Sequence, residues 1–97
     1  MELHLAELGL GFECEYRFHN KRLWRFDYRI EAPEDGCIAV EIEGGIWNRG
    51  RHTRGNGFQA DLDKYNAAAS EGWRVFRFST EDVMTGRAKQ FLKENLL

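Results

Sequence analysis

The chain has 97 residues, of which 42% are hydrophobic and 13% aromatic, so it can build one compact core. We therefore expect a single domain over residues 1–97. The formal charge of −2 excludes a uniformly basic surface but not a nucleic-acid partner, since phosphate binding depends on local positive charge. The sequence lacks a run of about 20 apolar residues and a signal-peptide pattern, and thus predicts a cytoplasmic protein without a membrane partner.

The first half of the chain predicts a short helix followed by three strands. Leucines in residues 1–10, with glycines at positions 9 and 11, suit a helix that ends at a glycine. Apolar and polar residues then alternate in three runs, separated by the turns "HNKR" and "PEDG". Two sets of side chains are expected to share one face of their strand: Trp24, Phe26, Tyr28 and Ile30 in the second strand, and Ile38, Val40 and Ile42 in the third.

The second half predicts a loop, a helix and a further strand. Residues 46–57 are rich in Gly, Arg and Asn without a period, which is typical of a loop. A helix is expected from Phe58 to about Glu71, ended by Gly72. Its expected buried stripe consists of Phe58, Leu62, Tyr65 and Ala69. "WRVFRF" is apolar on both faces, as in a strand covered by helices on each side.

A last helix is expected to run to Leu97. Thr80 does not predict a capping box, because Val83 stands three residues later, although "STEDV" supplies acids for a first turn. The resulting order is αβββαβα, with a helical crossover between two parallel strands. We therefore predict an α/β fold with a mixed four-stranded sheet flanked by helices.

Three carboxylates fall on the polar faces of two neighbouring strands. Asp27 lies in the middle of the second strand, and Glu41 and Glu43 share the polar face of the third. Residues on the same face of antiparallel neighbours lie within several Å, so we expect the three to converge. Such a cluster typically binds a hard cation such as Mg²⁺, which supports hydrolysis of a phosphodiester. Lys64, on the following helix, is a candidate for offsetting negative charge in the transition state.

Alternation alone also describes an ordinary solvated face of a sheet. In that interpretation the same carboxylates would form salt bridges with Arg25 and Arg29, and polar alternation is the commonest strand pattern. Gly44 and Gly45 favour a site, because glycines let a backbone or a ligand approach closely at the end of the strand.

A basic loop follows these glycines, with Arg49, Arg51, His52 and Arg54. Arginines form bidentate hydrogen bonds with phosphates, so this loop is expected to contact nucleic acid. His52 suits a general acid or base, or a phosphate contact, because its ordinary pKa is near neutrality. On sequence alone a surface histidine explains it equally well.

The combination of motifs resembles the PD-(D/E)XK nuclease superfamily. An Asp is followed, after thirteen residues, by E-x-E within αβββαβα order. The pieces "WRFDYRI", "VEIEGGIW", "GRHTRG" and "DLDKYNAAASEGWRVFRF" are similar to a small single-domain branch related to the very short patch repair endonuclease. The resemblance covers residues 12–80, and its combination of motifs is specific although each motif alone is weak.

This resemblance assigns roles to residues one by one. Asp27 and Glu41 match the two metal-binding acids of the superfamily, and His52 matches the histidine of its loop. Glu43 stands where the superfamily more often has lysine. Either Glu43 binds metal or orients water, or Lys64 restores the missing charge from the helix, and we expect both.

The expected function is hydrolysis of phosphodiester bonds in DNA, in a branched, nicked or mismatched duplex, with Mg²⁺ or Mn²⁺ as cofactor. At this size no further domain reads sequence, so specificity would come from DNA shape, from a homodimer or from a larger protein partner. The alternative is a nucleic-acid-binding module that keeps the fold without cleaving, since the usual E-x-K lysine is absent.

Overall fold

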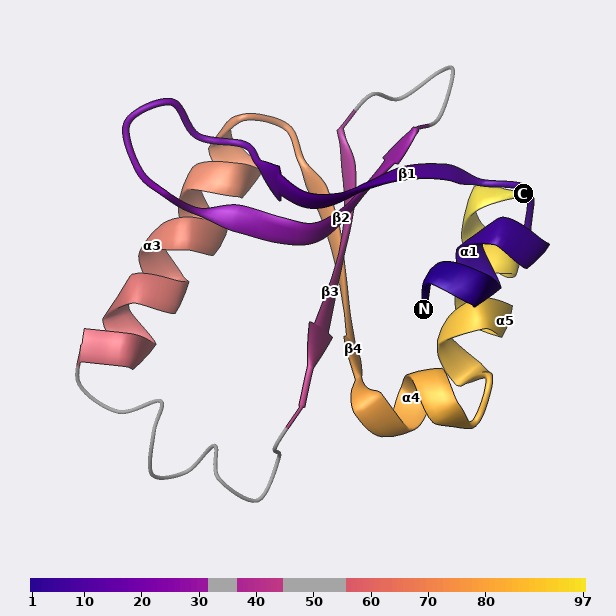
Figure 1. The fold of residues 1–97 in the computed structure, drawn as a ribbon. Coiled ribbons are helices and arrows are strands. Elements are labelled where there is room, and N and C mark those ends of the chain that lie inside the picture. The colour runs from indigo at the N-terminus through magenta and orange to yellow at the C-terminus, as the bar shows by residue number, and fades with distance from the viewer. Residues whose placement is uncertain (32–36, 45–55) are drawn as a thin grey trace.

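The protein folds as a mixed sheet between helices (Figure 1). The computed structural model describes residues 1–31, 37–44 and 56–97, except for the side chain at position 56. In this part of the chain, no helix is both long enough and apolar enough to cross a membrane. The helices and strands are, in chain order, α1 (Glu2–Glu7), β1 (Gly11–Arg17), β2 (Arg25–Glu31), β3 (Ile38–Glu43), α3 (Asn56–Ser70), β4 (Arg74–Ser79), α4 (Thr80–Met84) and α5 (Arg87–Leu96).

The four strands form one sheet in the order β1-β2-β3-β4. The β1–β2 and β2–β3 pairs are antiparallel, and β3 and β4 are parallel. Helix α3 makes the crossover between β3 and β4, as the sequence predicts. The predicted α/β class and the mixed four-stranded sheet are therefore confirmed.

Two hydrophobic clusters cover opposite faces of the sheet. One cluster packs Leu5 of α1 and Leu92 of α5 against β2, β3 and β4, and includes the fully buried Val40. The other packs Ala68 of α3 against Ala39 of β3 and Phe26 of β2. Because neighbours along β3 point to opposite faces, the helices form one layer on each side of the sheet (Figure 1).

Glycines end two of the helices, as expected. Gly9 follows α1 with φ 75°, and Gly72 follows α3 with φ 87°. A positive φ costs glycine little, because it has no Cβ to clash with the preceding carbonyl.

The buried stripe expected for α3 is confirmed only at Tyr65, which is partly buried and contacts Glu41 on the sheet. Phe58 and Leu62 are 53% and 42% exposed, and Ala69 is exposed as well. Lys64, which is partly buried, faces the sheet instead. The helix is rotated so that a charged side chain points inward, because Glu41 on the sheet provides a partner for it.

The C-terminal segment forms two helices, not the single helix expected. They are separated at Gly86, which caps α5 in the left-handed region at φ 83°. Helix α4 begins with a capping box one residue before the position considered in the sequence. The Ser79 hydroxyl accepts from the Asp82 N–H over 3.0 Å, and the Asp82 carboxylate accepts from the Ser79 N–H over 3.1 Å. The hydrogen bond from the Ser79 N–H lowers the pKa of Asp82.

Ser79→Ala should lower the free energy of unfolding by about 1 kcal/mol, because it removes the side-chain acceptor at the start of α4. Urea unfolding followed by circular dichroism would measure the change. Ser70→Ala is the matched control, since the Ser70 hydroxyl donates to the Ala67 carbonyl within its own helix turn and caps no helix start. This control should change stability by less than about 0.5 kcal/mol.

The Asp82 carboxylate of the capping box makes the stability of the protein depend on pH. A carboxyl whose pKa is lowered by folding stabilises the protein above its ordinary pKa, and that contribution is lost as pH falls through the lowered value. The stability difference between wild type and Asp82→Ala should therefore shrink on acidification. A difference that stays constant into strong acid would contradict the capping role.

Candidate active site

Strands β1 and β2 both change face at the position where Asp27 lies opposite Glu15. Tyr28 packs in the cluster under α1 and α5, whereas Phe26 packs in the cluster under α3. The β1–β2 register is the same on both sides of this point, so no residue is inserted, but Glu15 and Asp27 are left out of the pairing. Glu15 has φ 52°, which is uncommon for a residue with a side chain. The expectation that Phe26 shares a face with Tyr28 is therefore wrong, because the strand rotates at Asp27.

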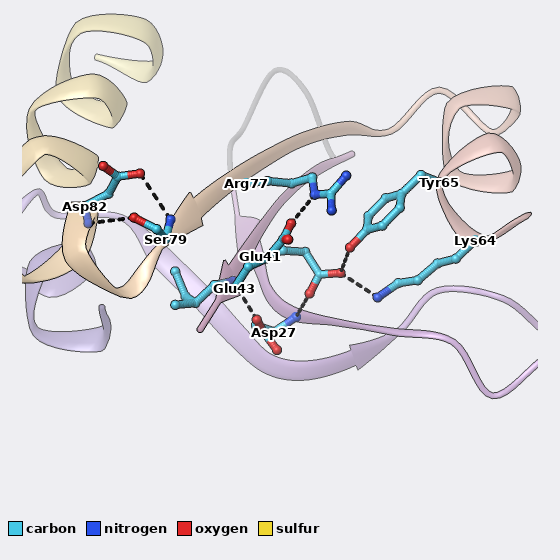
Figure 2. Close-up of polar contacts among 9 residues, drawn as sticks. Asp27, Glu41, Glu43, Lys64, Tyr65, Arg77, Ser79 and Asp82 are labelled. Atoms are coloured by element: carbon cyan, nitrogen blue, oxygen red, sulfur yellow. Dashed lines mark hydrogen bonds and ion pairs between the residues drawn. The ribbon is translucent and has the colours of Figure 1, made fainter. Parts of the chain in front are cut away.

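The backbone pairing of β2 with β3 ends at Tyr28, next to the position where β2 changes face. Beyond this point, side-chain carboxylates take the place of backbone carbonyls as hydrogen-bond acceptors. The Asp27 N–H donates to Oε2 of Glu41 over 3.2 Å, and the Ile42 N–H donates to Oδ2 of Asp27 over 2.7 Å. Figure 2 shows the two contacts side by side. Asp27 and Glu41 are thus held next to each other, as the sequence predicts.

Glu41 is a buried carboxylate, only 6% exposed. Its Oε1 accepts from the Lys64 ammonium at 2.5 Å and from the Tyr65 hydroxyl at 2.7 Å. The interpretation of Glu41 as part of a solvated face is therefore wrong, and so is its pairing with arginines of β2. A buried charge is tolerated only with charge-matched and hydrogen-bonded partners, and Glu41 has both.

Lys64 and Tyr65 reach Glu41 as neighbours on α3, across the sheet face. The Lys64 ammonium also lies over two aromatic rings, 5.6 Å from the centre of the Phe26 ring and 5.2 Å from that of Tyr65. Burial, followed by the hydrogen bond to Glu41, raises the pKa of the Tyr65 hydroxyl. Tyr65 therefore stays a proton donor to Glu41 at ordinary pH.

Glu43 has a different partner. It forms an ion pair with Arg77 of β4, whose guanidinium lies 4.3 Å from the centre of the Tyr65 ring. Arg77 stands beside Glu41 in the parallel register, and its side chain extends along β3 to Glu43. Figure 2 shows this pair next to the Glu41 cluster.

The carboxylates also line different clefts. Asp27 lines a cleft of about 440 Å³ together with residues of α1, β1 and α4, including Glu2 and Glu15. Glu43 lines a second cleft of about 260 Å³ beside α3, with Tyr65 and Arg77. Within residues 1–31, 37–44 and 57–97, no three His, Cys, Asp or Glu side chains are grouped closely enough to hold one metal ion. The structure thus joins Asp27 to Glu41 and does not bring Glu43 to them.

The basic loop cannot be placed in this site. Arg49, Arg51, His52 and Arg54 lie outside the described residues. Their proposed contacts with phosphates, and the acid–base role of His52, stay predictions.

Two residues of the site were missed in the sequence. Tyr65 was assigned to a buried stripe of α3, and Arg77 was treated as part of an apolar strand. A signal for Tyr65 existed, because it directly follows Lys64 and a tyrosine that is buried usually needs a hydrogen-bond partner. For Arg77, a charged residue within "WRVFRF" indicated a partner on the neighbouring strand.

Comparisons with known proteins support a nuclease-like fold. No protein-family model matches this sequence, and no functionally curated protein matches it. Among solved structures, the catalytic domain of the homing endonuclease I-Bth0305I is similar, with a TM-score of 0.66 and 17% sequence identity. The match covers 96% of this chain and 85% of that domain. At this identity the likeness concerns the fold, and this chain therefore has the fold of a nuclease catalytic domain.

Proposed function

We propose that this protein is a divalent-metal-dependent endonuclease that hydrolyses phosphodiester bonds in DNA, as a small member of the PD-(D/E)XK superfamily related to the very short patch repair endonuclease. The observation that carries the proposal is the junction of Asp27, Glu41 and Lys64, which come from three different elements. A fold shared with the catalytic domain of a homing endonuclease supports it.

The residues at this junction fit Mg²⁺ or Mn²⁺. Asp27 and Glu41 offer hard carboxylate oxygens, and Mg²⁺ is usually held by one or two carboxylates together with waters and substrate phosphates. Asp27 lines an open cleft, which gives a cation and a phosphate access. When bound, the metal ion would polarise a phosphoryl oxygen and lower the pKa of a water molecule.

Lys64 supplies the positive charge that E-x-K enzymes carry on the strand. Its ammonium neutralises Glu41 in the protein as it stands. With a metal ion bound beside Glu41, Lys64 would be able to offset the negative charge that develops on the phosphoryl group. The arginines at 49, 51 and 54 would hold the DNA backbone through contacts that do not depend on sequence.

The alternative function is a DNA-binding module that does not cleave. Glu43 in place of the usual lysine favours it, because its carboxylate is paired with Arg77 and adds no cation to the site. The two functions differ in one observable, which is DNA cleavage that requires Mg²⁺ or Mn²⁺.

Asp27→Asn should reduce cleavage to the level seen with a chelator, because it removes a charge that holds the metal ion. The amide oxygen can still accept from the Ile42 N–H, so the thermal unfolding midpoint should stay close to that of wild type. Single-turnover cleavage and a thermal melt check the two parts. Glu13→Gln is the control, since Glu13 is exposed and pairs with Arg29. Wild-type cleavage by Asp27→Asn would contradict the assignment.

Lys64→Met should lower the single-turnover rate about 10²–10³-fold, which is the typical effect of removing one donor that stabilises the transition state. Its Mn²⁺ affinity should not weaken, because Glu41 is left without its ammonium partner and attracts a cation more strongly. Calorimetric titration with Mn²⁺, beside the cleavage assay, separates the two effects. The variant must first be shown to fold, since breaking a buried ion pair costs about 3–5 kcal/mol. An unchanged rate in the folded variant would show that Lys64 only neutralises Glu41.

Replacing Arg49, Arg51 and Arg54 together by Ala should weaken DNA binding equally across sequences. The slope of log affinity against log salt should flatten by about 0.9 for each lost phosphate contact. Fluorescence anisotropy at several salt concentrations measures this slope. If the slope is unchanged, these arginines do not meet the DNA backbone.

A further inference from the structure

A continuous chain of contacts joins Glu43 to Glu41 through two side chains outside the expected site. Glu43 forms the ion pair with Arg77, and the Arg77 guanidinium lies over the Tyr65 ring at 4.3 Å from its centre. The Tyr65 hydroxyl then donates to Oε1 of Glu41 over 2.7 Å. Figure 2 shows the four side chains in this order, from β3 to β4, to α3 and back to β3.

We propose that Tyr65 is the positioning residue of the Glu41 carboxylate, and that Arg77, anchored by Glu43, holds the Tyr65 ring in the required orientation. This proposal rests on the proposed nuclease function, because it concerns the direction in which Glu41 presents its oxygens to a metal ion. It assigns Glu43 an indirect role through Arg77 and Tyr65, in place of metal binding.

Tyr65 is better suited than Lys64 to fix a direction. A lysine ammonium is a point charge on a flexible stem, so it neutralises Glu41 without selecting one orientation. A tyrosine hydroxyl sits on a rigid ring, and here one face of that ring is covered by a guanidinium. Hydrogen-bonded partners of metal-binding carboxylates orient them, and their loss typically weakens metal affinity or activity about 10–100-fold.

An indirect role for Glu43 is consistent with its position away from Asp27. Glu43 lines the cleft beside α3 with Tyr65 and Arg77, whereas Asp27 lines the other cleft. Glu43 is nevertheless connected to the site, because it holds Arg77, and Arg77 lies over the Tyr65 ring whose hydroxyl contacts Glu41.

The test compares Tyr65→Phe, Glu43→Gln and the double variant with wild type. Mn²⁺ affinity is measured by calorimetry, and single-turnover cleavage is measured on labelled duplex, flap, mismatched and four-way DNA. Tyr16→Phe is the matched control, because Tyr16 also carries an arginine guanidinium over its ring, that of Arg29 at 5.2 Å, but lies outside the Glu41 cluster. Removing the hydroxyl at position 16 should leave both readouts unchanged.

Tyr65→Phe should weaken Mn²⁺ affinity about 10-fold and slow cleavage about 10–100-fold in a folded protein. Glu43→Gln should act in the same direction, and the double variant should lose little more than the larger single loss, because both changes affect one chain of contacts. If Tyr65→Phe does not fold, Arg77→Lys tests the same chain, since it keeps the charge opposite Glu43 but removes the planar group over the ring.

Two results would overturn the proposal while leaving the nuclease function standing. One is a Tyr65→Phe variant that matches Tyr16→Phe in Mn²⁺ affinity and rate while wild type binds Mn²⁺ and cleaves. The other is a double variant whose fold-loss equals the product of the Tyr65→Phe and Glu43→Gln fold-losses. In that case Glu43 acts independently of Tyr65, as a direct ligand of the metal ion would. A wild-type protein that neither binds Mn²⁺ nor cleaves any substrate overturns the proposed function, and this proposal with it.

Discussion

The buried charge of Glu41 is the constraint on which the rest of the site depends. Moving a carboxylate out of water costs on the order of several kcal/mol unless donors and an opposite charge replace the water. In this fold the replacements come from β2 and α3, as the Asp27 N–H, the Lys64 ammonium and the Tyr65 hydroxyl. Satisfying one carboxylate therefore fixes β2, β3 and α3 relative to one another.

Two irregular features of the fold follow from this constraint. Strand β2 stops its ordinary pairing with β3 at Asp27, so that its N–H is available to Glu41. Helix α3 turns Lys64 toward the sheet and leaves Phe58 and Leu62 exposed, against the usual preference for burying apolar residues. Natural proteins depart from local rules mainly at functional sites, and both departures here occur around the same carboxylate.

The sequence predicts the order of the elements as far as β4, the parallel crossover and the nearness of Asp27 to Glu41, because these depend on periodicity and on short turns. It does not predict the rotation of β2 between Phe26 and Tyr28, since alternation assumes regular backbone pairing and here side chains replace it. The orientation of α3 was missed for a related reason. An apolar stripe indicates the buried face of a helix only when no charged residue of that helix has an oppositely charged partner on the surface it packs against.

The central claim is that Asp27 and Glu41 serve a metal ion in the cleavage of DNA. The most direct measurement is incubation of the wild-type protein with duplex, flap, mismatched and four-way DNA, in Mg²⁺, in Mn²⁺ and with a chelator. The account predicts cleavage of at least one substrate with either metal ion, and none with the chelator. Cleavage that is equal with and without the chelator, or DNA binding without cleavage under every condition, would contradict it.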